Sequence, residues 1–167
     1  INILISELDN ILSRNDYNTA RDFLEKWVDI AQNRNDNKSL FSLCNECIGL
    51  YRKIGDKENC YKYYEKTLDL LKVLNVENTV TGATAYTNCA TAYKAFGEAE
   101  KSISYFEKSV ALYETLLPDN DRRLAGFLSD SRYSGIVGLY EGALGFATNA
   151  YRPTNDSIMQ HVRGSSG

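Results

Sequence analysis

CIGLYRKIGDKENCYKYYEKTLDLL, residues 47–71, is the stretch of sequence that decides the fold. It recurs 42 residues further along the chain as CATAYKAFGEAEKSISYFEKSVALY, residues 89–113. In this register Tyr51 aligns with Tyr93, and a Glu-Lys pair in one stretch aligns with a Glu-Lys pair in the other. A match at one fixed offset is the sequence signature of a repeat architecture. We therefore expect the two stretches to form two copies of one structural unit.

Each copy has the pattern of two helices separated by a glycine. Apolar residues recur at intervals of three and four, which places them on one face of a helix. In the copy around Gly55 they are Cys44, Cys47, Ile48 and Tyr51 before the glycine and Cys60, Tyr64, Leu68 and Leu71 after it. Because neither helix can bury its apolar face alone, we expect antiparallel helix pairs that stack on one another.

These residues resemble the signature of the tetratricopeptide repeat, W-x2-L-G-x2-Y followed by A-x3-F. A third unit carries the motifs Tyr86-x2-Cys89-Ala90-x2-Tyr93 and Ser102-x3-Phe106. A second unit carries Cys44-x2-Cys47-Ile48-x2-Tyr51 and Cys60-x3-Tyr64. A weaker first unit carries Leu4-x2-Glu7-Leu8-x2-Ile11 and Ala20-x3-Leu24, with Asn15 in the position of the glycine.

The units recur every 40 to 42 residues, whereas the family's usual period is about 34. This length is similar to the longer repeats of kinesin light chain. The resemblance implies an all-α fold, a right-handed superhelical stack of antiparallel helix pairs. We predict three such pairs over residues 1–118, at about 1–36, 38–76 and 79–117.

The repeat pattern breaks down after Pro118. Residues 119–151 keep some helical spacing, but four glycines interrupt it. We predict one or more degenerate capping helices there, because terminal repeats are often atypical. An altered or truncated reading frame is the alternative. Residues 152–167 are predicted to be a flexible tail or sequence left over from expression.

Composition and charge exclude several classes of partner. The 19 basic and 22 acidic residues nearly balance, for a net charge of −3, so we expect no nucleic-acid partner. No polybasic segment or long apolar stretch predicts contact with a membrane. The chain opens without the basic region and cleavage site of a signal peptide, and we predict a cytoplasmic protein.

The four cysteines allow two interpretations. Cys44 and Cys47 form a C-x2-C motif, which could bind zinc together with Cys60 and Cys89 or act as a redox pair. However, all four occupy positions that the repeat fills with core residues, which favours buried, reduced thiols. We therefore predict no metal site and no cofactor.

No arrangement of residues points to catalysis. The single histidine, His161, lies in the predicted tail, which offers no fixed geometry for a Ser-His-acid triad. No glycine-rich loop has the spacing of a phosphate-binding motif. We predict that the protein is not an enzyme.

A polar stripe beside the apolar face of the first helix in each unit is the candidate binding site. It consists of Asn45 and Arg52 in the second unit and of Thr84, Thr87, Asn88, Thr91 and Lys94 in the third. The family resemblance implies that first helices line a concave groove that receives peptides. We expect these residues on one continuous concave face, with Asn88 the most central, because its amide can pair with an extended peptide backbone.

The predicted function is therefore a non-catalytic scaffold that binds a protein or an extended peptide. The alternative is a peptide-sensing regulatory domain of a bacterial signalling protein, because such proteins contain arrays that resemble this one. An upstream DNA-binding segment would distinguish the second function from the first.

Overall fold

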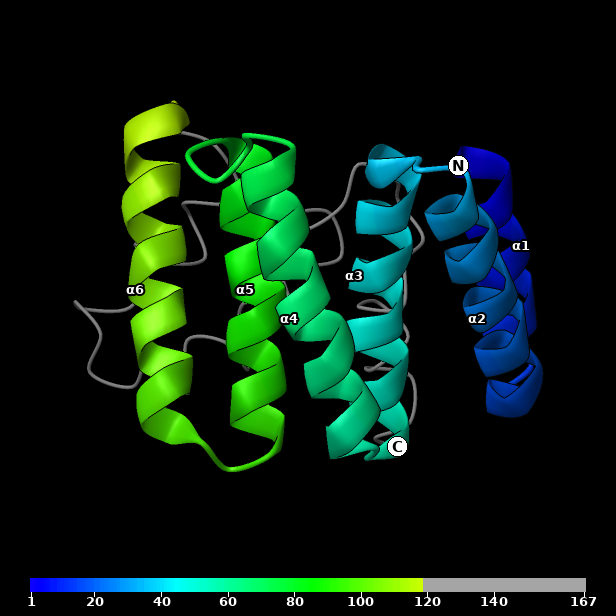
Figure 1. Ribbon diagram of the computed structural model, residues 1–167. Helices are drawn as coiled ribbons and strands as arrows, with labels where there is room; N and C mark the ends of the chain where they lie inside the picture. The colour runs from blue at the N-terminus through cyan, green and yellow to red at the C-terminus, as the bar shows by residue number, and fades with distance from the viewer. Residues whose placement is uncertain (119–167) are drawn as a thin grey trace. The chain divides into compact units, whose positions relative to one another are not determined.

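A computed structural model describes residues 1–118, which form six α-helices and contain no β-strand (Figure 1). The helices are α1 (Asn2–Leu12), α2 (Tyr17–Asn33), α3 (Asn37–Ile54), α4 (Lys57–Val73), α5 (Val80–Ala95) and α6 (Ala99–Leu116). The predicted all-α class is confirmed, and the helices fit a helical-repeat solenoid. The predictions for residues 119–151 and 152–167 lie outside the described residues.

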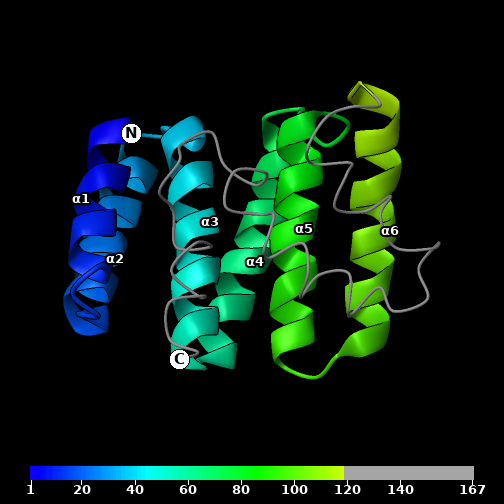
Figure 2. The same cartoon turned by 180° about the vertical axis from the view of Figure 1, so that it is seen from behind.

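The chain divides into two compact units between Asn75 and Val76. The first unit contains α1 to α4, in which each helix packs on the next along the chain. The second contains α5 and α6, which pack on each other. Figures 1 and 2 show α1 with α2, α3 with α4 and α5 with α6 as antiparallel hairpins.

The turns between helices follow a spacing of 20 residues. A residue with a left-handed backbone ends a helix or its turn at Asn15, Asn35, Gly55 and Asn75, and again at Gly97. Glycine and asparagine are the residues that adopt this conformation most readily. The 40-residue repeat is therefore made of two nearly equal halves, each one helix and one turn long.

An aspartate follows the left-handed residue in the first three turns. The side chains of Asp16, Asp36 and Asp56 each accept a hydrogen bond from the backbone N–H three residues later, at 3.1, 3.1 and 3.0 Å. In two of these turns the aspartate N–H also closes the preceding helix, since Asp36 donates to Ala31 O and Asp56 donates to Tyr51 O, both at 2.9 Å. One residue thus ends one helix and caps the next.

The connection between α4 and α5 is longer and explains the change of period from 40 to 42. After Asn75 the chain continues to Thr79, whose hydroxyl caps α5 by accepting from Gly82 N at 3.3 Å. Gly82 lies so close to this connection that a Cβ atom would be 2.3 Å from Glu77 O. A glycine is therefore required at this position.

Each of the last two helix pairs is joined by a side chain that donates to the backbone of the opposite helix. Cys60 Sγ donates to Ile48 O at 3.5 Å, and Ser102 Oγ donates to Ala90 O at 2.9 Å. Donors and acceptors are each 42 residues apart, so the predicted register of the repeat holds for these contacts.

None of the six helices has the length and apolar character that a membrane span requires, for the part of the chain that the structure describes.

Candidate functional site

The predicted site residues all lie on α3 or α5, the first helices of the last two pairs. Asn45 and Arg52 belong to the first unit, and the other five belong to the second. Four of the seven side chains are partly exposed, namely Asn45, Arg52, Thr84 and Lys94. The remaining three, Thr87, Asn88 and Thr91, are buried.

Thr87 lies inside the α5/α6 pair and does not line a binding surface. It has no exposed area, and its Oγ1 is 3.1 Å from Ala83 O and 2.6 Å from Ser109 Oγ. Ser109 Oγ donates to the same carbonyl at 2.8 Å. These bonds join α5 to α6, so the hydroxyl of Thr87 serves the fold.

Asn88 and Thr91 are accessible only at their edges. Their exposed fractions are 7% and 4%, and the Thr91 hydroxyl donates to the carbonyl of Asn88 at 2.8 Å. Periodicity alone placed both residues beside the core of the pair, but α5 is buried over most of its circumference. A ligand could therefore reach little of either side chain.

The partly exposed polar residues also bond to their own helices. Asn45 Nδ2 donates to Phe41 O at 2.9 Å, and Thr84 Oγ1 donates to Val80 O at 3.0 Å. The Thr84 hydroxyl is also 2.9 Å from the hydroxyl of Tyr113 on α6. These bonds hold both side chains in fixed positions, which lowers the entropic cost of any contact that they make with a ligand.

Arg52 and Lys94 are two cations in equivalent positions, 42 residues apart in the last turns of α3 and α5. A positive charge is favourable there because it opposes the negative end of the helix dipole. Burial lowers the pKa of Arg52, but a guanidinium stays charged at neutral pH. Each helix pair therefore offers one partly exposed cation at the same point of its first helix.

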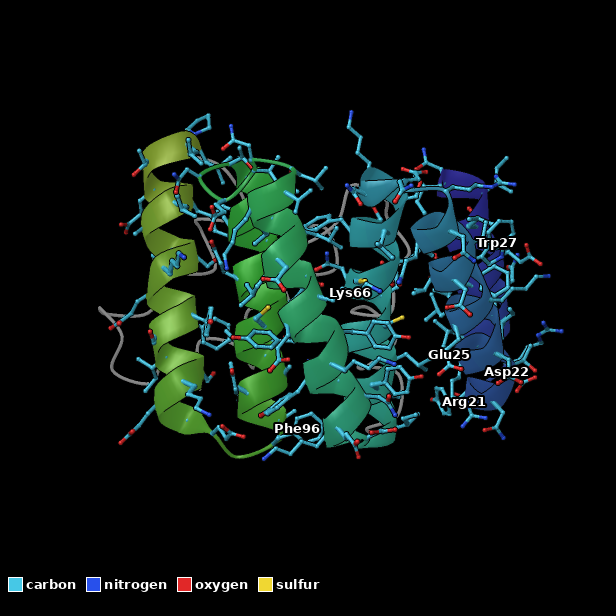
Figure 3. All side chains as sticks on the ribbon, viewed as in Figure 1. Arg21, Asp22, Glu25, Trp27, Lys66 and Phe96 are labelled. Atoms are coloured by element: carbon cyan, nitrogen blue, oxygen red, sulfur yellow. The ribbon has the colours of Figure 1, made fainter. Side chains whose placement is uncertain are left out.

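A polar cluster that the sequence patterns did not predict connects α2 to α3 and α4. The buried hydroxyl of Tyr51 donates to Glu25 Oε1 at 2.5 Å, and its ring stacks on Tyr63 with centroids 5.6 Å apart. Lys66 Nζ donates to Gln32 Oε1 at 2.5 Å. Figure 3 shows Glu25 on the side of α2 toward α3, and Lys66 on α4.

Burial of the Tyr51 hydroxyl raises the pKa of this residue, and the hydrogen bond and charge of Glu25 add to the shift. The periodicity of α3 predicts that Tyr51 is buried. It carries no information about which residue of another helix meets its hydroxyl, so Glu25 could not be found from the spacing.

The third unit repeats the aromatic part of this cluster. Tyr93 stacks on Tyr105 with centroids 5.7 Å apart, as Tyr51 stacks on Tyr63 42 residues earlier. Lys101 Nζ lies 5.3 Å from the centroid of the Tyr93 ring. The prediction that Tyr51 and Tyr93 occupy equivalent positions is therefore confirmed.

The four cysteines are buried, as their positions in the repeat predicted, and none is in a disulfide. Burial raises the pKa of Cys44 and of Cys60 to about 12, so both thiols stay protonated at neutral pH. Within residues 1–118, no group of histidine, cysteine and carboxylate side chains has the arrangement of a metal site. Their chemistry is that of small core residues.

Comparison with known proteins gives one match. A family model described as a tetratricopeptide repeat matches residues 48–115, which run from α3 into α6. This match supports the predicted resemblance to the tetratricopeptide repeat, while the likeness to kinesin light chain stays a prediction. Neither a curated protein nor a solved structure matches the chain.

Proposed function

We propose that this protein is a non-catalytic module that binds an extended segment of a partner protein along the first helices of its repeats. The observation that carries the proposal is the tetratricopeptide match over residues 48–115, because repeats of this kind generally mediate contacts between proteins. The confirmed equivalence of the second and third units supports it, since equivalent helices present equivalent side chains.

The proposed binding residues are the predicted ones that keep an accessible side chain. In the first unit they are Asn45 and Arg52, and in the second they are Thr84, Lys94 and the exposed edges of Asn88 and Thr91. Thr87 is left out because it is fully buried. Each unit is proposed to contact the segment independently.

The repeated cation determines the chemistry of the proposed ligand. Arg52 and Lys94 each add a positive charge to a face whose other proposed residues are neutral. A peptide with acidic side chains, or one that ends in a carboxylate, would form charge-assisted hydrogen bonds with them.

Selection from a library of displayed random peptides tests this proposal. The full chain should enrich peptides with acidic residues, and Arg52→Ala or Lys94→Ala should weaken their binding. Loss of a hydrogen bond between charged groups costs about 1.5 to 3 kcal/mol, or roughly 10- to 100-fold in affinity. Calorimetry on each variant measures the change.

Two control variants make the result specific. Lys72→Ala removes an exposed lysine in the last turn of α4 and should leave peptide affinity unchanged. Thr87→Val should lower the melting temperature without changing affinity, because its hydroxyl bonds only within the α5/α6 pair. Equal affinity of wild-type protein, Arg52→Ala and Lys94→Ala would refute the proposed surface.

A further inference from the structure

The side of the α3/α4 pair that faces α2 shows how one helix pair covers the next. Cys44, Tyr51 and Tyr63 are buried on this side, and Lys66 lies beside them. The covering helix α2 places Glu25 on the Tyr51 hydroxyl and Gln32 on the Lys66 ammonium. Contacts from one helix of one pair to both helices of the next therefore define an interface with a known register.

The α1/α2 pair has a side of the same composition. Subtracting 40 from these positions gives Leu4, Ile11, Phe23 and Lys26, which are again three core-type residues and a lysine. Leu4 and Phe23 are partly exposed, although their equivalents are buried.

Ile3 gives the largest contrast between the two pairs. It is 84% exposed, whereas its equivalent Leu43 is 1% exposed. Trp27, one turn after Phe23 with its ring centroid 6.3 Å away, extends the apolar surface along α2. Figure 3 shows Trp27 on the side of α2 opposite Glu25. We call the surface formed by Ile3, Leu4, Phe23 and Trp27 the outer face.

An apolar outer face differs from the polar surface that ends a repeat array in water. Scattered exposed apolar residues need no explanation, but these four coincide with positions that a further pair would cover. We propose that the outer face binds another helix pair of the same repeat, placed ahead of Ile1 in the same polypeptide.

Two polar residues beside the outer face determine the chemistry of that partner. Glu7 and Asn10 are exposed and stand where Cys47 and Leu50 are buried. Burial raises the pKa of Cys47, and the nearby carboxylate of Glu25 adds to this shift, so the two residues are close.

A covering helix with a glutamate in the Glu25 position would therefore place it near Glu7, where the two charges would repel. A lysine or arginine there would attract instead. The covering helix thus carries a basic residue in that position, and an acceptor for Lys26 in the position of Gln32.

The test adds a defined helix pair to the full chain. A copy of residues 1–40 is placed directly before Ile1, with Glu25→Lys and Trp27→Phe in the added copy. The protein has one tryptophan, so the native Trp27 then reports on the outer face alone. We expect its emission to move to shorter wavelength, its quenching by acrylamide to fall severalfold, and helix content to rise.

Three comparisons decide the result. An added copy that keeps Glu25 should protect Trp27 less than the copy with lysine. Ile3→Glu in the native part should abolish protection, whereas Val73→Glu should not, because Val73 is an exposed apolar residue outside the face.

The proposal is wrong if Trp27 stays as accessible as in the original chain, or if the added residues form no helix. Equal protection by both copies would overturn the requirement for a basic residue. Concentration-dependent protection of Trp27 in the original chain, with self-association in the ultracentrifuge, would show that a second copy occupies the face instead.

Discussion

At the scale of single residues, the buried polar groups of this protein are paired with groups on a neighbouring helix. The hydroxyl of Tyr51 has Glu25, and that of Ser102 has the carbonyl of Ala90. Such pairing is required because a buried hydroxyl without a partner costs free energy. Sequence periodicity predicted which of these residues are buried, but the partner depends on how close two helices approach.

Thr87 illustrates the same limit for the candidate site. Periodicity placed it beside the core face of α5, where either a groove or the neighbouring helix could meet it. The many small residues of α5, among them Ala83 and Ala90, let α6 come close enough for Ser109 to meet the Thr87 hydroxyl. Which side a neighbouring helix occupies is not encoded in the spacing of a single helix.

Tyr51→Phe tests the contribution of the bond to Glu25. We expect the free energy of unfolding to fall by about 1 to 2 kcal/mol, because a hydrogen bond to a charged group is lost while the exposed carboxylate stays hydrated. Tyr17→Phe is the control, since that hydroxyl bonds at the surface to Asn15. Urea unfolding measures both, and equal values for the two variants would contradict the assignment.

The buried thiols make stability depend on pH in the alkaline range. The pKa of Cys44 and of Cys60 is about 12 in the folded protein, against about 8.5 for an unperturbed cysteine. Between these values the unfolded chain releases thiol protons that the folded protein keeps, so stability is complete below about pH 8.5 and falls as pH rises. The pKa values of Tyr51 and Tyr63 are also raised, which adds to this fall.

Urea unfolding at pH 7.5 and pH 10 measures the effect. Cys60→Ser should make the dependence shallower, because serine does not titrate but can donate to Ile48 O as Ser102 donates to Ala90 O. A stability that is equal at the two pH values would contradict the raised pKa values.

At the scale of elements, the aspartate that caps each helix sets where it begins. The Asn-Asp and Gly-Asp pairs at 20-residue intervals were visible in the sequence, but a search for the 42-residue match passes over a half-period. Once the caps are known, they explain why the first pair is regular although its apolar motif is weak, since Asp16 caps α2 as Asp56 caps α4.

Asp56→Ala tests this capping. We expect a loss of about 1 kcal/mol in unfolding free energy at neutral pH and a smaller loss for Asp56→Asn, because asparagine also caps helices. The hydrogen bonds from Asn59 lower the pKa of Asp56. The stabilisation is therefore present above the unfolded-state pKa of about 3.9 and is lost as pH falls through the folded-state value. A gap between wild type and Asp56→Ala that persists at pH 2 would contradict this explanation.

The connection before α5 provides a second test at this scale. In Gly82→Ala the new methyl group would clash with backbone carbonyls of Val76 and Glu77, which cannot move as a flexible side chain can. In Gly55→Ala the space around the Cβ position is open, so only the left-handed backbone is penalised, by about 1 to 2 kcal/mol. Thermal unfolding should therefore show a larger loss for Gly82→Ala, and the reverse order would contradict the close approach.

At the scale of the whole molecule, the fold class and the repeat register followed from the sequence because both depend on which residues are buried. The register placed Tyr51 and Tyr93 in equivalent positions, and the family match covers the same two units. The candidate site followed less well, because three of its seven residues are buried. Exposure depends on neighbouring helices, which local periodicity does not locate.

Hydrogen–deuterium exchange of the full chain with a selected acidic peptide tests the proposed function most directly. The account predicts that bound peptide slows exchange in α3 and α5, around Arg52 and Lys94, and leaves exchange in α4 and α6 nearly unchanged. Protection confined to the second helices, or an absence of protection in both first helices at saturating peptide, would contradict binding along the first helices.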